Sequence, residues 1–228
     1  MRVASISRTT PLRSSNHHRI SRLSADAWEQ RKFAELFYPI PNNSLSRADL
    51  NYDNGSVRSV HYGDILVRYG DVLDAQRDTI PYITGANISA LESVRLRDGD
   101  VLLADAAEDE TVGKTVEIQG ITGTPVVSGL HTIACRPMIP TAPSYLGHYM
   151  NSRAFHDQLL PIMQGTKVSS VSRTSLARTV VSLPTALEEQ SRVGAMFTSL
   201  DELITLHQRE SNDPHGTTRK MTNARSTT

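Results

Sequence analysis

Basic and hydroxyl side chains gather between residues 153 and 178, and this segment is the part of the sequence best equipped to bind a ligand. Arginine and lysine neutralise phosphates, hydroxyl groups donate to phosphate oxygens, and arginine can read a guanine edge with two hydrogen bonds. The pattern predicts a nucleic-acid surface, and a solvated loop is the alternative interpretation. The candidate contact residues are Arg153, Thr166, Lys167, Ser169, Ser170, Arg173 and Arg178, with Lys114 as an outlying candidate.

The formal net charge of the 228 residues is zero, but the charge is unevenly distributed. Residues 1–25 hold five arginines and no acid, residues 26–130 hold nine basic and 17 acidic residues, and residues 131–182 hold five basic residues and one acid. Residues 183–210 sum to −3 and the last 18 residues to +2. Phosphate attraction acts over roughly a Debye length, so local sign matters more than the total. We expect any nucleic-acid surface to lie within 131–182, with the two tails as weaker candidates.

The sequence contains none of the familiar catalytic or metal-binding motifs that we searched for by residue type and spacing. Gly113-Lys114-Thr115 resembles the end of a phosphate-binding P-loop, but the first glycine of that motif would fall at Glu108. The sequence contains no H-E-x-x-H, no G-x-S-x-G and no Asn-Pro-Pro-aromatic motif. Cys135 is the single cysteine, which argues against structural zinc and disulfides, and His131 is interpreted as a strand residue. These observations predict a non-catalytic chain without a metal site.

Carboxylates near residue 108 leave one enzymatic alternative open. Asp105, Glu108, Asp109 and Glu110 lack EF-hand spacing, and a solvated turn explains them better than a cation site. Asp105, Asp109 and Glu117 could instead serve a small metal-dependent nuclease. A third interpretation is a protein-interaction module whose terminal helix docks on a partner without any DNA contact.

Short strands separated by turns are predicted between residues 57 and 135. The β-branched or alternating runs are VRSV, DILVRY, PYITG, VRL, DVLLA, TVEIQ, PVV and LHTIAC, bounded by Gly, Asp, Asn and Pro. Residues 62–67 and 98–103 echo each other, each with a Gly-Asp turn before a buried strand. Helices are predicted in 28–37 and 144–160, and an extended run in 180–183.

The clearest local signal is a helix over residues 185–210. Thr185 and Glu188 fit a capping box, and Pro214 with Gly216 ends the helical pattern. An apolar seam with coiled-coil spacing follows over about two heptads. We expect this seam to bind a second helix, and its members are Val193, Phe197, Leu200, Ile204 and His207.

The fold class that follows is mixed α/β (α+β). We expect a compact domain over 28–184, the helix over 185–210, and disordered tails over 1–27 and 211–228. No stretch approaches the roughly 18 to 20 apolar residues of a membrane span. A lone cysteine suits a reducing cytoplasm, so we predict a cytoplasmic protein without membrane contact.

The order of motifs resembles the specificity (S) subunit of type I restriction–modification enzymes. Residues 145–210 carry the resemblance most clearly, in YLGHYMNSRAFHDQL, then QGTKVSSVSRTSL, then VSLPTALEEQSRVGAMFTSLDELITLHQRE. Upstream, GDVLLADAAEDETVGK and VVSGLHTIACRP are similar to the recognition domain of that family, and WEQRKFAELF is similar to its opening segment.

The resemblance implies a sequence-specific subunit that binds double-stranded DNA and does no chemistry itself. A modification subunit would methylate adenine with S-adenosylmethionine, and a translocating restriction subunit would cleave unmethylated DNA. S-adenosylmethionine, ATP and Mg²⁺ would therefore be bound by those partner subunits and not by this chain.

The sequence departs from the family pattern in its length. S subunits usually have two recognition domains and two helical regions, whereas 228 residues accommodate one of each. The predicted helix also ends near Glu210, short of the expected spacer. Two alternatives follow: a half-subunit that works as a homodimer or with a second half, giving a symmetric site, or an inactive truncated cassette.

Overall fold

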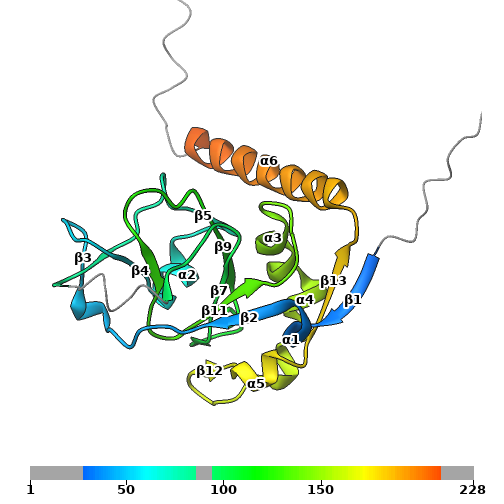
Figure 1. Cartoon of the computed structure of the whole chain (residues 1–228), viewed down its shortest axis with the longest axis horizontal. Helices are drawn as coiled ribbons and strands as arrows, with labels where there is room; N and C mark the ends of the chain where they lie inside the picture. Colours follow the sequence, from blue (N-terminus) through cyan, green and yellow to red (C-terminus); the bar gives the residue numbers. More distant parts are fainter. Residues whose placement is uncertain (1–27, 86–93, 212–228) are drawn as a thin grey trace, which may run out of the picture.

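A mixed five-stranded sheet lies at the centre of the molecule in the computed structural model, which describes residues 28–85 and 94–211 (Figure 1). Its strands follow the order β2-β11-β7-β9-β5, and all neighbours are antiparallel except β9 and β5. The strands are β2 (Phe37–Ile40), β5 (Val72–Asp74), β7 (Val101–Ala104), β9 (Thr115–Gln119) and β11 (Thr132–Pro137).

Both faces of this sheet are buried, which explains why its strands read as continuous apolar runs. Successive side chains alternate, so Leu103 enters one core while Leu102 enters the other. The first core receives buried apolar side chains from four helices, and the second receives Ile65 of α2 and side chains from strands of another sheet. Those four helices are α1 (Phe33–Leu36), α3 (Tyr145–Asn151), α4 (Arg153–His156) and α5 (Arg173–Leu176).

Smaller sheets surround the centre. A four-stranded sheet has the order β10-β4-β6-β3 and comprises β3 (Leu50–Asn51), β4 (Arg58–Val60), β6 (Tyr82–Ile83) and β10 (Val126–Ser128). Two antiparallel pairs join β1 (Trp28–Lys32) to β13 (Val180–Pro184), and β8 (Ala106–Ala107) to β12 (Ser169–Ser170). Short 3₁₀ turns occupy Arg47–Asp49 and Leu160–Ile162. The long helix α6 (Leu187–Ser211) crosses one side of the domain (Figure 1).

The predicted mixed α/β class is confirmed, and so are most of the predicted strands. One clear error is DILVRY, because residues 62–67 form helix α2 (Tyr62–Val67). The His61 imidazole caps this helix by accepting a hydrogen bond from the Gly63 amide at 3.1 Å, and Asp64 lies in its first turn. The echo of 62–67 with 98–103 therefore pairs a helix with a strand, so its structural interpretation was wrong. The run VRL also contributes only a single β-bridge, at Arg95.

The opening segment was also predicted incorrectly. Residues 28–32 form a strand, and only one helical turn, α1, follows it. Residues 28–32 are extended because they pair with β13, with Trp28 opposite Pro184 and Lys32 opposite Val180. The predicted helix over 144–160 is present as α3 and α4, and the extended run over 180–183 is present in β13. The tails 1–27 and 212–228 lie outside the described residues, and Ser211 ends α6.

A buried carboxylate holds α3 against the central sheet. Glu117 on β9 accepts hydrogen bonds from the backbone amides of Ser144, at 2.7 Å, and Gly147, at 3.1 Å. Burial raises the pKa of Glu117, and these hydrogen bonds partly oppose that shift. Glu117 therefore positions a helix, and among the described residues it is not grouped with Asp105 and Asp109 as a metal-ligand set. None of the described helices combines the length and apolar character needed to cross a bilayer.

The close approach of α3 to the chain before β5 requires glycine at position 147. A Cβ at Gly147 would lie 2.2 Å from the backbone oxygen of Asp71, which real Cβ contacts do not reach. The same oxygen accepts a hydrogen bond from the Glu117 amide at 2.9 Å, so it is held in place.

We predict that Gly147→Ala lowers the free energy of unfolding by about 1–3 kcal/mol, because the added methyl group overpacks a rigid contact. This sign is diagnostic, since Gly→Ala inside a helix normally stabilises a protein by roughly 0.5–1 kcal/mol. Urea unfolding followed by circular dichroism measures the change. Gly70→Ala is the matched control, because nothing lies within 4 Å of a Cβ added there. A neutral or stabilising Gly147→Ala would contradict the packing described.

Candidate nucleic-acid surface and partner helix

The predicted contact residues with hydroxyl groups lie on a closed loop over residues 164–170. Gln164 and Ser170 exchange two backbone hydrogen bonds, at 3.0 and 2.8 Å, and so close the loop. Gly165 has a φ of 119°, and a Cβ there would lie 2.0 Å from the Val168 oxygen. The tight turn therefore needs glycine, and it presents Thr166 and Lys167 to solvent.

Arg173 and Arg178 extend this surface along the chain. Arg173 begins α5, whose N-cap is the Ser172 hydroxyl, which accepts from the Ser175 amide at 3.0 Å. The Arg173 guanidinium donates to Asn42 Oδ1 at 3.1 Å and to the Thr132 carbonyl at 3.4 Å, which leaves it exposed but oriented. Arg178 follows α5 and is also exposed. The stretch 166–178 thus brings six of the eight predicted residues into consecutive segments, namely Thr166, Lys167, Ser169, Ser170, Arg173 and Arg178.

The other two predicted residues belong to different elements. The Lys114 ammonium is half-buried and donates to the carbonyls of Leu66, at 3.2 Å, and Tyr69, at 3.0 Å, at the end of α2. Burial lowers the pKa of Lys114. Arg153 begins α4 and pairs with Asp157 at 3.4 Å, with its side chain almost fully exposed. Lys114 therefore stabilises a helix end in this structure, while Arg153 remains available on the surface.

The separation of charge along the sequence does not persist in space. Strand β12 pairs with β8, so Ser169 is paired with Ala107 and Ser170 with Ala106. The acidic residues 108–110 follow β8 directly. The basic and hydroxyl loop therefore has an acidic neighbour, which the sequence-based estimate of its local charge did not include.

The carboxylates of the nuclease alternative are engaged separately. Asp105 Oδ1 lies 3.1 Å from His131 Nδ1, and Asp109 Oδ1 accepts from the Thr111 amide at 2.9 Å. Glu117 caps α3, as described above. His131 itself is not a strand residue as predicted: it lies in the turn before β11 with a φ of 53°, a strained value for a residue other than glycine. This arrangement argues against a nuclease built on these three acids.

Sequence reasoning missed a second cationic group beside α2. The buried carboxylate of Asp64 pairs with Arg47 at 2.9 Å and Arg68 at 3.6 Å. Both guanidinium groups also donate to the Tyr52 hydroxyl, at 3.0 and 2.6 Å, and Arg68 lies 5.1 Å from the centre of the Tyr52 ring. Two half-exposed cations thus share one buried anion, leaving an excess positive charge on the surface. No local motif signals this group, because its charges belong to a net acidic stretch of sequence.

A cavity of about 620 Å³ lies between α2, the 164–170 loop and the acidic loop that follows β8 (residues 108–111). Tyr62 and His131 contribute ring faces to it, with ring centres 5.2 Å apart in an edge-on arrangement. Val168 from the 164–170 loop and Glu108 from the acidic loop also line it. Val67, the last residue of α2, lines this cavity, and Arg68 follows it in the sequence.

Polar contacts anchor one face of α6 to the domain. The buried Gln190 side chain accepts from the Ala142 amide at 3.0 Å and donates to the Pro184 carbonyl at 2.7 Å. Trp28 Nε1 donates to Glu189 at 2.9 Å. A Cβ at Gly194 would lie 2.8 Å from the Pro143 oxygen, so this glycine permits close helix packing. The WEQ and EEQ motifs at opposite ends of the chain therefore meet at one junction.

Apolar side chains of α6 form a largely exposed strip beside these anchoring contacts. Phe197, Leu200 and Ile204 are 42%, 45% and 55% exposed, and His207 is also exposed. Val193 is partly buried and packs on the first core. Further exposed apolar residues widen the strip, namely Met196, Leu203 and Leu206. The predicted capping box is displaced: α6 begins at Leu187, and its first helical hydrogen bond runs from the Gln190 amide to the Ala186 carbonyl.

Three solved structures have the same fold over most of this chain. The S subunit of a type I restriction–modification system from M. genitalium matches with a TM-score of 0.50 and 9% identity over 79% of the chain. The HsdS subunit from Thermoanaerobacter tengcongensis matches with a TM-score of 0.53 and 19% identity over 83%. A structure described as the basis of complex assembly and conformational transition of the type I system matches with a TM-score of 0.55 and 18% identity over 81%.

The match covers 41% of each solved chain, so this chain corresponds to less than half of their length. No protein-family model and no curated protein matches the sequence. The chain therefore has the fold of one part of a type I S subunit, as the resemblance of its motifs predicted.

Proposed function

We propose that this chain is a half-length specificity subunit that selects the DNA sequence on which a type I restriction–modification complex acts. The observation that carries the proposal is the shared fold: about 80% of this chain matches 41% of each solved chain. One recognition domain with one helix is the repeating half that the family resemblance implies. The chain would direct adenine methylation and restriction without performing either reaction, and double-stranded DNA, a modification subunit and a restriction subunit would be its partners.

Two cationic groups are the proposed DNA contacts. The 164–170 loop offers Lys167 and hydroxyl groups, and Arg173 follows in an oriented, exposed position. Beside α2, Arg47 and Arg68 are held by Asp64 and so are fixed before any ligand arrives. Fixed cations lose little side-chain entropy on binding, which favours them as phosphate contacts. Glu108 and Asp109, which line the cavity, would limit how closely a phosphate backbone approaches there.

The exposed strip on α6 is the proposed partner surface. It comprises Met196, Phe197, Leu200, Leu203, Ile204 and Leu206, and Phe197 also contacts the domain, with its ring centre 5.6 Å from that of His148. Six exposed apolar side chains on one helix indicate a binding surface, because monomeric proteins rarely expose large apolar patches to water. A second copy of this chain would pair its own strip with this one, and a symmetric DNA site would follow from the two-fold axis.

We predict that Lys167→Ala weakens binding to duplex DNA of any sequence. The negative slope of log K against log salt should become less steep by about 0.9, because one phosphate contact is lost. Fluorescence anisotropy with a labelled duplex between 50 and 200 mM salt measures both quantities. A residue that reads a base would instead lower discrimination at one position and leave the salt slope nearly unchanged.

Lys32→Ala is the matched control, since Lys32 is an exposed lysine at the end of β1 and outside both proposed contact groups. It removes the same charge from the chain. Equal changes in the two variants would show that only the overall charge matters. A slope unchanged by Lys167→Ala would remove Lys167 from the contact set.

We predict that Leu200→Lys combined with Ile204→Lys weakens self-association of the chain by at least about tenfold, because two cations would be placed in an apolar contact. Sedimentation velocity over a concentration series measures the association constant. Ser191→Lys is the control, because Ser191 is exposed on the same helix and its neighbours three, four and seven residues on are Gly194, Ala195 and Thr198, none of which belongs to the strip. A wild-type chain that stays monomeric at high concentration would contradict pairing between copies.

A further inference from the structure

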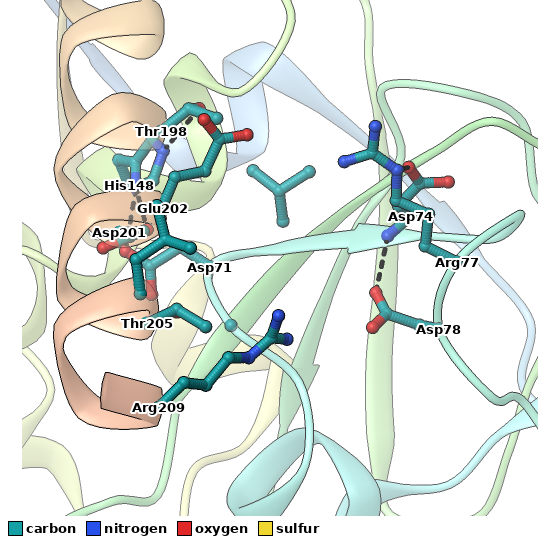
Figure 2. Close-up of a pocket in the computed structure, with 13 residues that line it drawn as sticks. Asp71, Asp74, Arg77, Asp78, His148, Thr198, Asp201, Glu202, Thr205 and Arg209 are labelled. Carbon is teal, nitrogen blue, oxygen red and sulfur yellow. Dashed lines mark hydrogen bonds and ion pairs between the residues drawn. The ribbon is translucent and has the colours of Figure 1, made fainter. Parts of the chain in front are cut away.

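A pocket of about 500 Å³ lies where α6 crosses the edge of the central sheet at β5 (Figure 2). Its wall holds a group of three side chains from three separate elements. Asp71 immediately precedes β5, His148 lies on α3, and Asp201 lies on α6. Figure 2 shows the three gathered on the α6 side of the pocket, with Asp74 and Asp78 opposite.

The ligand atoms of these residues are close enough to surround one ion. His148 Nδ1 lies 3.0 Å from Asp71 Oδ2 and 3.8 Å from Asp201 Oδ2, and all three ligand atoms lie within 4.8 Å of one another. Ligands in a tetrahedral zinc site, at about 2.0–2.1 Å from the metal, are about 3.3 Å apart. The observed distances fall on both sides of that value, so shifts of under about 1 Å would complete the geometry.

Neighbouring residues orient the two inner ligands. Asn151 Nδ2 donates to Asp71 Oδ1 at 2.8 Å, which leaves Oδ2 facing His148. His148 Nε2 lies 3.2 Å from the Thr198 hydroxyl, and its side chain is only 5% exposed. A second partner on the far ring nitrogen is a regular feature of histidines that bind metal, because it sets the ring orientation. This group therefore differs from a surface cluster of acids: its central member is a buried, oriented imidazole.

The charge of the pocket favours a cation. Asp74, Asp78 and Glu202 add three carboxylates to those of Asp71 and Asp201, whereas Arg77 and Arg209 are the guanidinium groups in the lining. Arg77 is already paired with Asp74 at 3.4 Å. Five carboxylates therefore face two guanidinium groups in this pocket, and a divalent ion would offset the excess negative charge.

We propose that Asp71, His148 and Asp201 bind a divalent transition-metal ion, with Zn²⁺ as the ion best matched to one imidazole and two carboxylates. The fourth coordination position would face the pocket, where water can fill it. Because the ligands come from α6, α3 and the segment before β5, the ion would cross-link the helix to the domain. The sequence signals no such site, because the three residues are 77 and 53 positions apart and form no motif.

The test is titration of the metal-free full-length chain with ZnCl₂, followed by calorimetry, and with CoCl₂, followed by visible absorption. We expect one equivalent to bind at this site and the melting temperature to rise by roughly 5–10 °C at a hundredfold excess over Kd. Asp201→Asn should weaken binding at least about tenfold. Asp201 is largely exposed, so this variant is expected to fold.

Glu202→Gln is the matched control, because it removes one carboxylate from the next position of α6 in the same pocket. It should leave the affinity within about twofold. The adjacent pair His17 and His18 offers an unrelated ligand set, so all titrations use a His17→Asn, His18→Asn background. The cobalt spectrum should show the intense visible bands of four-coordinate geometry in the wild-type chain and lose them in Asp201→Asn.

Three results would overturn the proposal. Absence of binding would mean that a proton alone joins His148 to the two carboxylates. Equal loss in Asp201→Asn and Glu202→Gln would indicate diffuse attraction by an acidic pocket. Binding retained in both Asp71→Asn and Asp201→Asn would place the ion elsewhere. None of these results bears on DNA binding, so the proposed function is tested independently.

Discussion

The pairing of β1 with β13 is the constraint on which the position of α6 depends. This antiparallel ladder places Trp28 opposite Pro184, three residues before the helix begins. Trp28 can then donate to Glu189, and Gln190 can bond on both sides of the junction. Side-chain amides buried in this way are costly to leave unpaired, so they select one helix direction over others. A helix of 25 residues converts any change at that junction into a large displacement at its far end.

Buried polar groups, more than apolar ones, fix how the layers meet. Glu117 caps α3 from the central sheet, and the same helix carries His148, which meets Thr198 on α6. Directional hydrogen bonds therefore connect the central sheet to α3 and α3 to α6. Apolar cores on both faces of the sheet supply the bulk of the stability, and hydrogen bonds to specific atoms add a directional constraint. In a subunit whose proposed task is to hold a recognition domain at a set distance from a partner, such rigidity is the physical requirement.

The sequence predicted those features that depend on local pattern. DVLLA and TVEIQ read as strands because both faces of the central sheet are buried, and α6 carries its own periodicity. The error at residues 62–67 arose because six residues are too few to separate a buried helix from a strand. The error at residues 28–32 arose because the strand exists only through its pairing with residues 180–184. Sites assembled from distant residues were invisible for the same reason, including Arg47 with Arg68 and Asp71 with His148. The charge of the 164–170 loop was misjudged because β8 lies beside β12.

We propose that this chain chooses a DNA target for a modification subunit. The decisive measurement is a map of adenine methylation across the genome of cells that lack other methyltransferases and express this chain with its modification subunit. We expect a new methylated motif that is symmetric, interrupted by a spacer and dependent on this chain. No new methylation, with both proteins soluble and the modification subunit active beside a full-length specificity subunit, would contradict it and favour an inactive cassette.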